Sequence, residues 1–276
     1  MFKRIYSFLL IISLGLFLST TSAFAFSTSL LFDEDALGNF SEIDNFRLRT
    51  LTNPVTITQE LGADGFLGNG DRFTESWQSD IDFSTLTGGG NLFHGNDLVI
   101  DIFLEGYVDD FSGPGNISAT NPGALAAATF DIIFDGGSAT ISSSAGVLAQ
   151  LDLITGIGDD ATFLSGVNAS FNDFGALFAF TSIDPNAFAL PPLPGSPLTD
   201  LVNSGFLLSI ATGSARFNSV TGDDGGTPGD NTDDKLTILV DDQGSLVTFA
   251  VVPEPTTMLL FGVGLIGLAG IGRRRS

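Results

Sequence analysis

Residues 98–105 read Leu-Val-Ile-Asp-Ile-Phe-Leu-Glu, with an apolar side chain at every second position. In an extended strand successive side chains point to opposite faces of the sheet. One face of this stretch therefore collects the apolar side chains of Leu98, Ile100, Ile102 and Leu104. Such alternation predicts a strand with one buried face, and it favours a fold built mainly from strands.

Other segments carry the same signal. Residues 55–58 and 129–134 are rich in β-branched and aromatic side chains. In 147–153 the apolar face would consist of Val147, Ala149, Leu151 and Leu153. Gly-rich and Asp-rich turns punctuate the chain between such segments, for example at 88–90, 112–115, 135–137 and 222–226. Short strands with regular turns predict an all-β body of the antiparallel β-sandwich type.

Two strands are predicted close to the end of the body. Residues 236–240 and 246–251 flank the sequence Asp241-Asp242-Gln243-Gly244. A glycine in such a short connection can adopt the left-handed conformation that a tight turn requires. The spacing therefore predicts a hairpin in which these two strands pair with each other.

The composition of the 276 residues excludes several kinds of function. The chain has no cysteine and a single histidine, His94, so disulfides, thiolate metal sites and multi-histidine metal centres are ruled out. Residues 26–252 hold 5 basic and 31 acidic residues, a net charge of −26. A body of this charge repels nucleic acid and anionic membrane surfaces, so we expect no nucleic-acid partner.

The first 25 residues have the three parts of a secretory signal peptide. Lys3 and Arg4 precede a largely apolar run from 5 to 18, and Ala23-Phe24-Ala25 follows. This order predicts a signal helix that enters the general secretory translocon and is cut by signal peptidase after Ala25. An uncleaved membrane anchor is the alternative, although the apolar run is short for a span.

The last 24 residues form a second distinct segment. Pro253-Glu254-Pro255 breaks the chain, since proline does not fit a helix interior. Residues 256–272 follow as 17 uncharged, Gly-rich residues, at the short limit for a transmembrane helix. Arg273, Arg274 and Arg275 then favour a cytoplasmic location for this end.

This tail resembles the PEP-CTERM sorting signal of Gram-negative bacteria, which has the same three parts in the same order. The resemblance implies recognition by a membrane-embedded exosortase that processes the tail near Pro253–Pro255, and export to the cell surface or an extracellular polysaccharide matrix. We expect transient or retained anchoring in the inner membrane through this segment. A plain C-terminal anchor is the alternative, and it would still place the body outside. The predicted organisation is a signal peptide at 1–25, an acidic extracytoplasmic body at 26–252 and a sorting segment at 253–276.

A second resemblance lies within residues 31–82. The sequences Leu-Phe-Asp-Glu-Asp at 31–35 and Leu-Gly-Asn-Gly-Asp-Arg-Phe-Thr-Glu at 67–75 are similar to the start of flocculation-associated PEP-CTERM proteins. This resemblance implies a role in cell aggregation within exopolysaccharide.

An acidic loop is the one candidate metal site. Five carboxylates lie between 223 and 234, on Asp223, Asp224, Asp230, Asp233 and Asp234. Calcium binds six to eight oxygen ligands, which flexible Asp-rich loops can supply. The spacing does not match an EF-hand loop, and a solvated Asp/Gly turn is the commoner explanation. No other cofactor is expected.

The sequence offers little support for catalysis. His94 is the only histidine, no Gly-x-Ser-x-Gly elbow occurs, and we expect His94 on a loop surface or in a local turn hydrogen bond. Glu75 lies two residues before Trp77, a pair that suits contact with a sugar ring. An indole in a core or at an edge is the alternative for Trp77, and we expect no enzyme.

Three hypotheses for function remain. The first is an exported surface or matrix protein with a structural or adhesive role in exopolysaccharide-associated aggregation, as in flocculation or biofilm. The second is a secreted carbohydrate-binding module, whose aromatic platform would consist of Trp77, Tyr107 or phenylalanines. The third is a glycoside hydrolase, which would need a carboxyl group whose removal abolishes turnover.

Overall fold

A computed structural model describes most of the body. It covers residues 26–251 except 28, 38, 50–54, 95–96, 165–167, 171–172, 190–201, 203–205, 213–214, 227–230 and 243–244. The predicted signal helix and the predicted transmembrane helix both lie outside these residues. Residues Ser27–Ala250 form one compact unit, which does not include the two ends of the chain. Within the described residues, no helix combines the length and the apolar character that crossing a membrane requires.

The described strands all belong to one antiparallel sheet. In chain order they are β1 (Phe26–Ser27), β2 (Leu30–Phe32), β3 (Ser41–Leu48), β4 (Val55–Glu60), β5 (Arg72–Leu86), β6 (Asn91–Phe93), β7 (Val99–Ser112), β8 (Thr129–Ser143), β9 (Gly146–Leu164), β10 (Asn168–Ser170), β11 (Asp173–Ile183), β12 (Phe188–Ala189), β13 (Phe206–Thr212), β14 (Ala215–Asp223), β15 (Lys235–Asp242) and β16 (Ser245–Val251). A 3-10 helix, η1 (Pro122–Ala127), connects β7 and β8.

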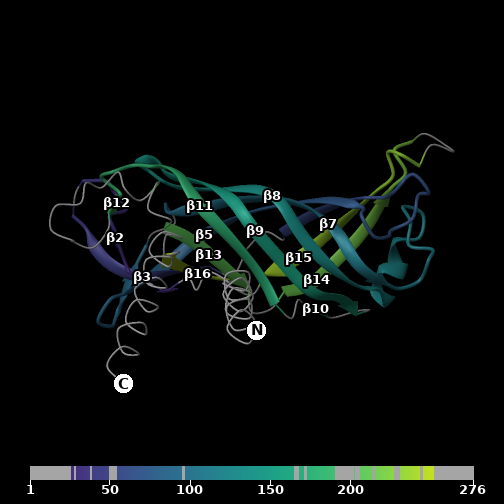
Figure 1. The fold of residues 1–276 in the computed structure, drawn as a ribbon, viewed down its shortest axis with the longest axis horizontal. Helices are drawn as coiled ribbons and strands as arrows, with labels where there is room; N and C mark the ends of the chain where they lie inside the picture. The colour runs from purple at the N-terminus through teal and green to yellow at the C-terminus, as the bar shows by residue number, and fades with distance from the viewer. Residues whose placement is uncertain are drawn as a thin grey trace, which may run out of the picture. The chain divides into compact units, whose positions relative to one another are not determined.

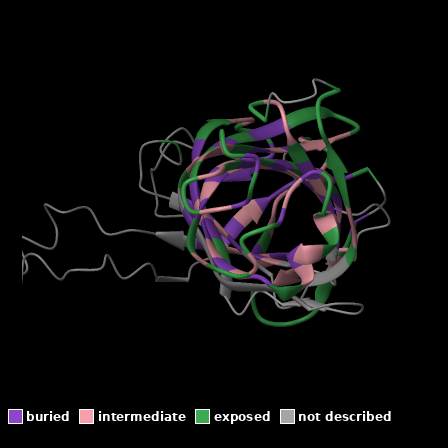
Figure 2. Ribbon diagram, turned by 90° about the vertical axis from the view of Figure 1, so that its right-hand side faces the viewer, coloured by how far each residue is buried: buried purple, intermediate pink, exposed green. Residues whose placement is uncertain are grey.

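Eight of these strands close into a barrel. The ring runs β3-β16-β13-β11-β9-β8-β7-β5, and it closes because β5 also pairs with β3. Figure 2 shows these strands arranged around a common axis. The all-β, antiparallel prediction is confirmed, but the sandwich is wrong. One sheet curls until its two edges meet, so the inward side chains of a single sheet form the core.

The long strand β5 forks the sheet, because it changes partner along one edge. Its first half pairs with β4, from Phe73 opposite Gln59 to Ser76 opposite Thr56. Its second half pairs with β3, from Ile81 opposite Leu48 onward. β3 and β4 therefore follow each other along β5. The β4 branch continues into β15 and β14, while the β3 branch belongs to the ring (Figure 1).

The fork corrects the predicted hairpin near the end of the body. Both predicted strands exist, as β15 and β16. Among the described residues they do not pair with each other, since β15 lies between β4 and β14 and β16 lies between β3 and β13. Lys235 opposite Glu60 begins the ladder between β15 and β4. A short connection allows two consecutive strands to pair. Here β15 instead joins the branch that contains β4 and β14, and β16 joins the ring between β3 and β13.

The two strongest strand patterns behave differently. In β7 the predicted inner face is confirmed, because Leu98, Ile100, Ile102 and Leu104 are at most 2% exposed. In β9 the register against β8 shifts at Ser142, which opposes Val147, whereas Ile141 opposes Ala149. This bulge turns Val147 outward and buries Leu148 instead. The prediction that Val147 faces the core is therefore wrong.

Phenylalanine dominates the core. Near β3 the ring of Phe46 meets Phe32 and Phe249 edge to face, with centroids 5.1 and 5.2 Å apart. Between β5 and β8, Phe73 meets Phe134 in the same way at 5.4 Å. Such edge-to-face pairs add to the stabilisation that burial of the rings supplies.

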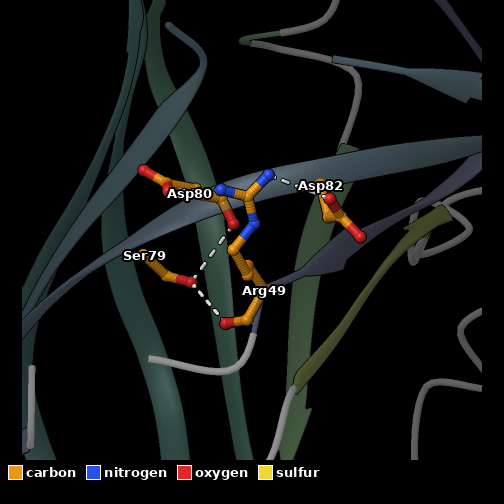
Figure 3. A network of polar contacts seen from close by, with 4 residues as sticks. All are labelled: Arg49, Ser79, Asp80 and Asp82. Carbon is orange, nitrogen blue, oxygen red and sulfur yellow. Dashed lines mark hydrogen bonds and ion pairs between the residues drawn. The ribbon is translucent and has the colours of Figure 1, made fainter. Parts of the chain in front are cut away.

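A polar clamp holds the fork itself (Figure 3). Arg49 directly follows β3, and its guanidinium binds Asp80 at 3.2 Å and Asp82 at 3.1 Å, both on β5. The backbone N–H of Arg49 donates to the carbonyl oxygen of Asp80 at 2.8 Å. Ser79 donates its hydroxyl to the carbonyl of Arg49 at 3.1 Å. One arginine therefore bridges two carboxylates at the point where β5 passes from β4 to β3.

We expect Arg49→Ala to lower the free energy of unfolding by roughly 1–2 kcal/mol, because half-exposed ion pairs contribute up to about 1 kcal/mol each. The substitution also leaves two carboxylates close together without their shared cation. Chemical denaturation at low and high salt measures the effect, which should shrink as salt screens the pair. Arg47→Ala is the matched control, since Arg47 is exposed on β3 and makes no ion pair with a described residue. An equal loss in both variants would contradict the clamp.

Candidate functional site

A shallow groove lies on the outer face of the barrel, across β5, β7 and β8. Because side chains alternate between the two faces of a strand, the buried residues of β7 leave Asp101 and Phe103 on the outside. The groove has a volume of about 390 Å³. Its lining consists of Ser76, Trp77, Gln78, Asp101, Ile102, Phe103, Ser138 and Thr140.

The strand register arranges the outward side chains of this face in two rows. In the first row Ser76 lies opposite Phe103, which lies opposite Ser138. In the second row Gln78 lies opposite Asp101, which lies opposite Thr140. Both rows continue onto β9, where the exposed Asp152 and Gln150 follow. We call these eight side chains the outer rows.

The groove combines one aromatic ring with polar groups that can still bind a ligand. Phe103 is 42% exposed, so part of its ring is open to solvent within the groove. Gln78 donates a hydrogen bond to Asp101 at 2.7 Å, so the amide and carboxylate are held beside the ring. The hydroxyls of Ser76, Ser138 and Thr140 have no hydrogen-bond partner among the described residues.

The charge around the groove is negative. Asp101 lies within it, Asp152 extends its first row, and Glu105 lies two residues beyond Phe103 on the outer face of β7. Arg72, also on the outer face of β5, binds Asp135 at 2.6 Å. This hydrogen bond raises the pKa of the Arg72 guanidinium, and the Asp135 carboxylate offsets its positive charge. The groove therefore favours neutral ligands over anionic ones.

The predicted sugar contact Trp77 lines this groove but is half-buried. It shares the alternation of the buried Phe73, Glu75 and Ser79, so its side chain belongs to the inner row of β5. Glu75 is only 8% exposed. The ring that faces outward at this place is Phe103, which the sequence reasoning missed. Its signal was present, because Phe103 is the aromatic side chain on the polar face of the strongest predicted strand.

The acidic loop does not gather its carboxylates among the described residues. Asp223 and Asp224 each accept a hydrogen bond from a glycine two residues later, at 3.1 and 3.2 Å. Asp233 packs against Gly225, where a Cβ would overlap its carboxylate. Asp230 lies outside the part of the chain that the structure describes. Within that part, no three His, Cys, Asp or Glu side chains are grouped as a metal site would require, and calcium remains a prediction.

His94 joins three side chains that are distant in sequence. Its Nε2 lies 2.6 Å from Ser84 Oγ, and its Nδ1 lies 2.7 Å from Glu34 Oε2. An ionised carboxylate can only accept a hydrogen bond, so Nδ1–H donates to Glu34, while Nε2 and the Ser84 hydroxyl share the second hydrogen bond. The imidazole also meets Phe32 edge to face at 5.7 Å. The expectation of a surface or local turn histidine is wrong, because His94 is 6% exposed and binds residues 10 and 60 positions away.

A hydroxyl, an imidazole and a carboxylate in this order resemble a hydrolytic triad in geometry. A nucleophile must be reachable by its substrate, however, and Ser84 is 0% exposed. The imidazole side chain is also 0% exposed, and only the Glu34 side chain, at 31%, reaches solvent. In this structure the three groups form a buried hydrogen-bonded relay that ties the β2–β3 connection to β5.

The predicted sorting residues Pro253, Glu254, Pro255, Arg273, Arg274 and Arg275 lie outside the described residues, as do Ala23 and Ala25. Comparison with protein families identifies the PEP-CTERM protein-sorting motif at residues 251–276. No curated protein and no solved structure matches the chain.

The molecule is thus an acidic, all-β body followed by a sorting segment. The chain carries a PEP-CTERM protein-sorting motif, in agreement with a PEP-CTERM sorting-domain protein. The motif implies export, processing by an exosortase, and sorting to the surface or to a membrane-associated location.

Proposed function

We propose that this protein is a structural or adhesive component of the cell surface or extracellular matrix, where it takes part in exopolysaccharide-associated aggregation of cells. The observation that carries the proposal is the sorting motif at residues 251–276. The net charge of −26 on residues 26–252 supports it, because such a body stays soluble outside the cell and can be bridged to other acidic polymers by divalent cations. The proposed role is not catalytic.

Cell fractionation combined with intact-mass measurement tests the sorting step. We expect a mature form that begins near Phe26, lacks the segment after Pro253 and is found in the surface or matrix fraction. In Glu254→Ala the full-length chain should become the main species and remain in the inner membrane, because the processing motif is altered. Glu60→Ala, which changes an exposed glutamate of the body, is the matched control and should be sorted normally. A wild-type chain that keeps its arginine tail in the inner membrane would overturn the proposal.

Aggregation of cells tests the role itself. A strain without this protein should flocculate less and retain less exopolysaccharide, and the wild-type gene should restore both properties, whereas the Glu254→Ala gene should not. Unchanged aggregation in the deletion strain, with normal sorting of the wild-type chain, would limit the conclusion to an exported surface protein.

A further inference from the structure

The outer rows place hydrogen-bonding groups on both sides of an aromatic ring. Phe103 lies between Ser76 and Ser138 in one row, and Gln78 and Asp101 form a hydrogen-bonded pair in the next. Along a strand the two rows are about 6.6 Å apart, at about 3.3 Å per residue. A ligand that covers the ring can therefore reach polar groups of both rows at once.

This combination matches the chemistry of a sugar. A pyranose ring has an apolar C–H face that packs on an aromatic ring, and hydroxyl groups around its edge that both donate and accept hydrogen bonds. Carboxylate and amide oxygens accept from such hydroxyls, while the amide N–H₂ and the serine and threonine hydroxyls can donate to them. A lipid or an apolar peptide would leave these polar groups without partners, which costs binding free energy.

The form of the groove favours a polymer over a small molecule. Small-molecule sites enclose most of the ligand surface, whereas this groove is shallow and its side chains are largely exposed. The outer rows cross β5, β7, β8 and β9, which are successive neighbours in the sheet at the usual strand spacing of about 4.8 Å. This spacing is close to the length of one sugar residue in an extended chain, so successive residues can meet successive strands.

The charge selects among polysaccharides. Asp101 and Asp152 belong to the outer rows, Glu105 lies beside them, and Arg72 is paired with Asp135. A uronic-acid or sulfated polymer would meet like charges here, and Arg72, the described cation on this face of β5, already binds Asp135. A neutral chain meets no such repulsion.

We propose that the outer rows form a binding site for a neutral polysaccharide, with Phe103 as the stacking platform and Gln78, Asp101 and the flanking hydroxyls as hydrogen-bonding groups. The inference rests on the proposed function and names the surface through which the body would hold exopolysaccharide. In this arrangement the sugar stacks on Phe103 and not on Trp77, because the Trp77 side chain belongs to the inner row. Trp77 still lines the groove, so its fluorescence can serve as a signal of binding.

The test uses the exported protein purified from its host, with a soluble neutral glucan, the host's own exopolysaccharide and anionic alginate as ligands. Trp77 is the only tryptophan, so its fluorescence follows events at the groove without labelling. The titrations contain a chelator, so that divalent cations cannot bridge alginate to the acidic body; we then expect the neutral glucan and the exopolysaccharide to change this fluorescence and alginate to leave it unchanged. Phe103→Ala should weaken binding at least about tenfold, and Gln78→Ala should weaken it less.

Phe66→Ala is the matched control, because Phe66 is 41% exposed on a different part of the surface and should bind like wild type. Since both phenylalanines are exposed, both variants should fold normally, which thermal unfolding verifies. If the exopolysaccharide binds equally well to wild type and Phe103→Ala, the groove is overturned while the proposed function stands. If wild type binds alginate and not the glucan, the assignment to a neutral polymer is overturned. If it binds none of the three and the deletion strain aggregates normally, the proposed function fails as well.

Discussion

His94→Ala is expected to lower the free energy of unfolding by about 3 kcal/mol. The substitution leaves the fully buried hydroxyl of Ser84 without its imidazole partner, and an unsatisfied buried polar group costs about 1–3 kcal/mol. It also opens a cavity beside Phe32 and Phe46, whose rings contact the imidazole. Chemical denaturation of the exported protein measures the loss.

Two further variants distinguish the loss of the hydrogen bonds of His94 from a general loss of stability caused by any substitution near this position. Ser84→Ala should cost roughly 1–2 kcal/mol, and the double variant should cost less than the sum, since both changes break the same hydrogen bond. Phe93→Ala changes the neighbouring residue, which is 71% exposed, and should cost less than about 1 kcal/mol. A loss in His94→Ala that is no greater than in Phe93→Ala would show that the relay does not stabilise the fold.

Gly106→Ala is expected to destabilise the barrel by about 3 kcal/mol or more, near the upper end for overpacked cores. Gly106 is buried in β7, where a Cβ would overlap the carbonyl oxygen of Ile133 and lie 2.9 Å from Cζ of Phe73. The carbonyl belongs to the neighbouring strand β8, so it cannot move without breaking the ladder. Phe73 lies opposite Gly106, and its ring occupies the space that the absent side chain leaves.

Gly175→Ala is the matched control for this steric argument. Gly175 also lies within a strand, β11, but a Cβ there would meet nothing within 4 Å. Replacing it should be neutral or stabilise the protein by about 0.5–1 kcal/mol, because alanine has less conformational freedom in the unfolded chain. Thermal and chemical unfolding measure the free energy of unfolding of both variants in parallel. An equal loss in Gly106→Ala and Gly175→Ala would refute the steric explanation.

Local patterns predicted the strands of this protein better than their pairing. The alternation in 98–105 identified β7 and its inner face, since burial on one side follows directly from a period of two. The barrel could not be predicted, because its closure depends on β3 meeting β5 and β16, which lie far apart in sequence. The bulge at Val147 and the fork at Arg49 could not be predicted from the sequence for the same reason. Both depend on which strand lies alongside.

The candidate sites show the same limit. The sorting motif was predictable, since its three parts are contiguous and need no fold to be recognised. The prediction of Trp77 as the sugar contact depends on its residue type alone. The ring that is exposed in the groove is Phe103, because it lies on the outer face of the sheet. The relay was missed because Glu34 and Ser84 meet His94 only after three separate segments have folded together.

The ring of strands has a consequence for the order of events during biogenesis. β16 ends at Val251, two residues before Pro253, and it is the strand that joins β3 to β13. Contacts between such distant parts of a chain form slowly, and those made by β16 are among the last that the chain can form. The ring can therefore close only when the last strand of the body is present. Until then β3 and β13 lack the partner that lies between them, and the sheet keeps two unpaired edges at which it can aggregate.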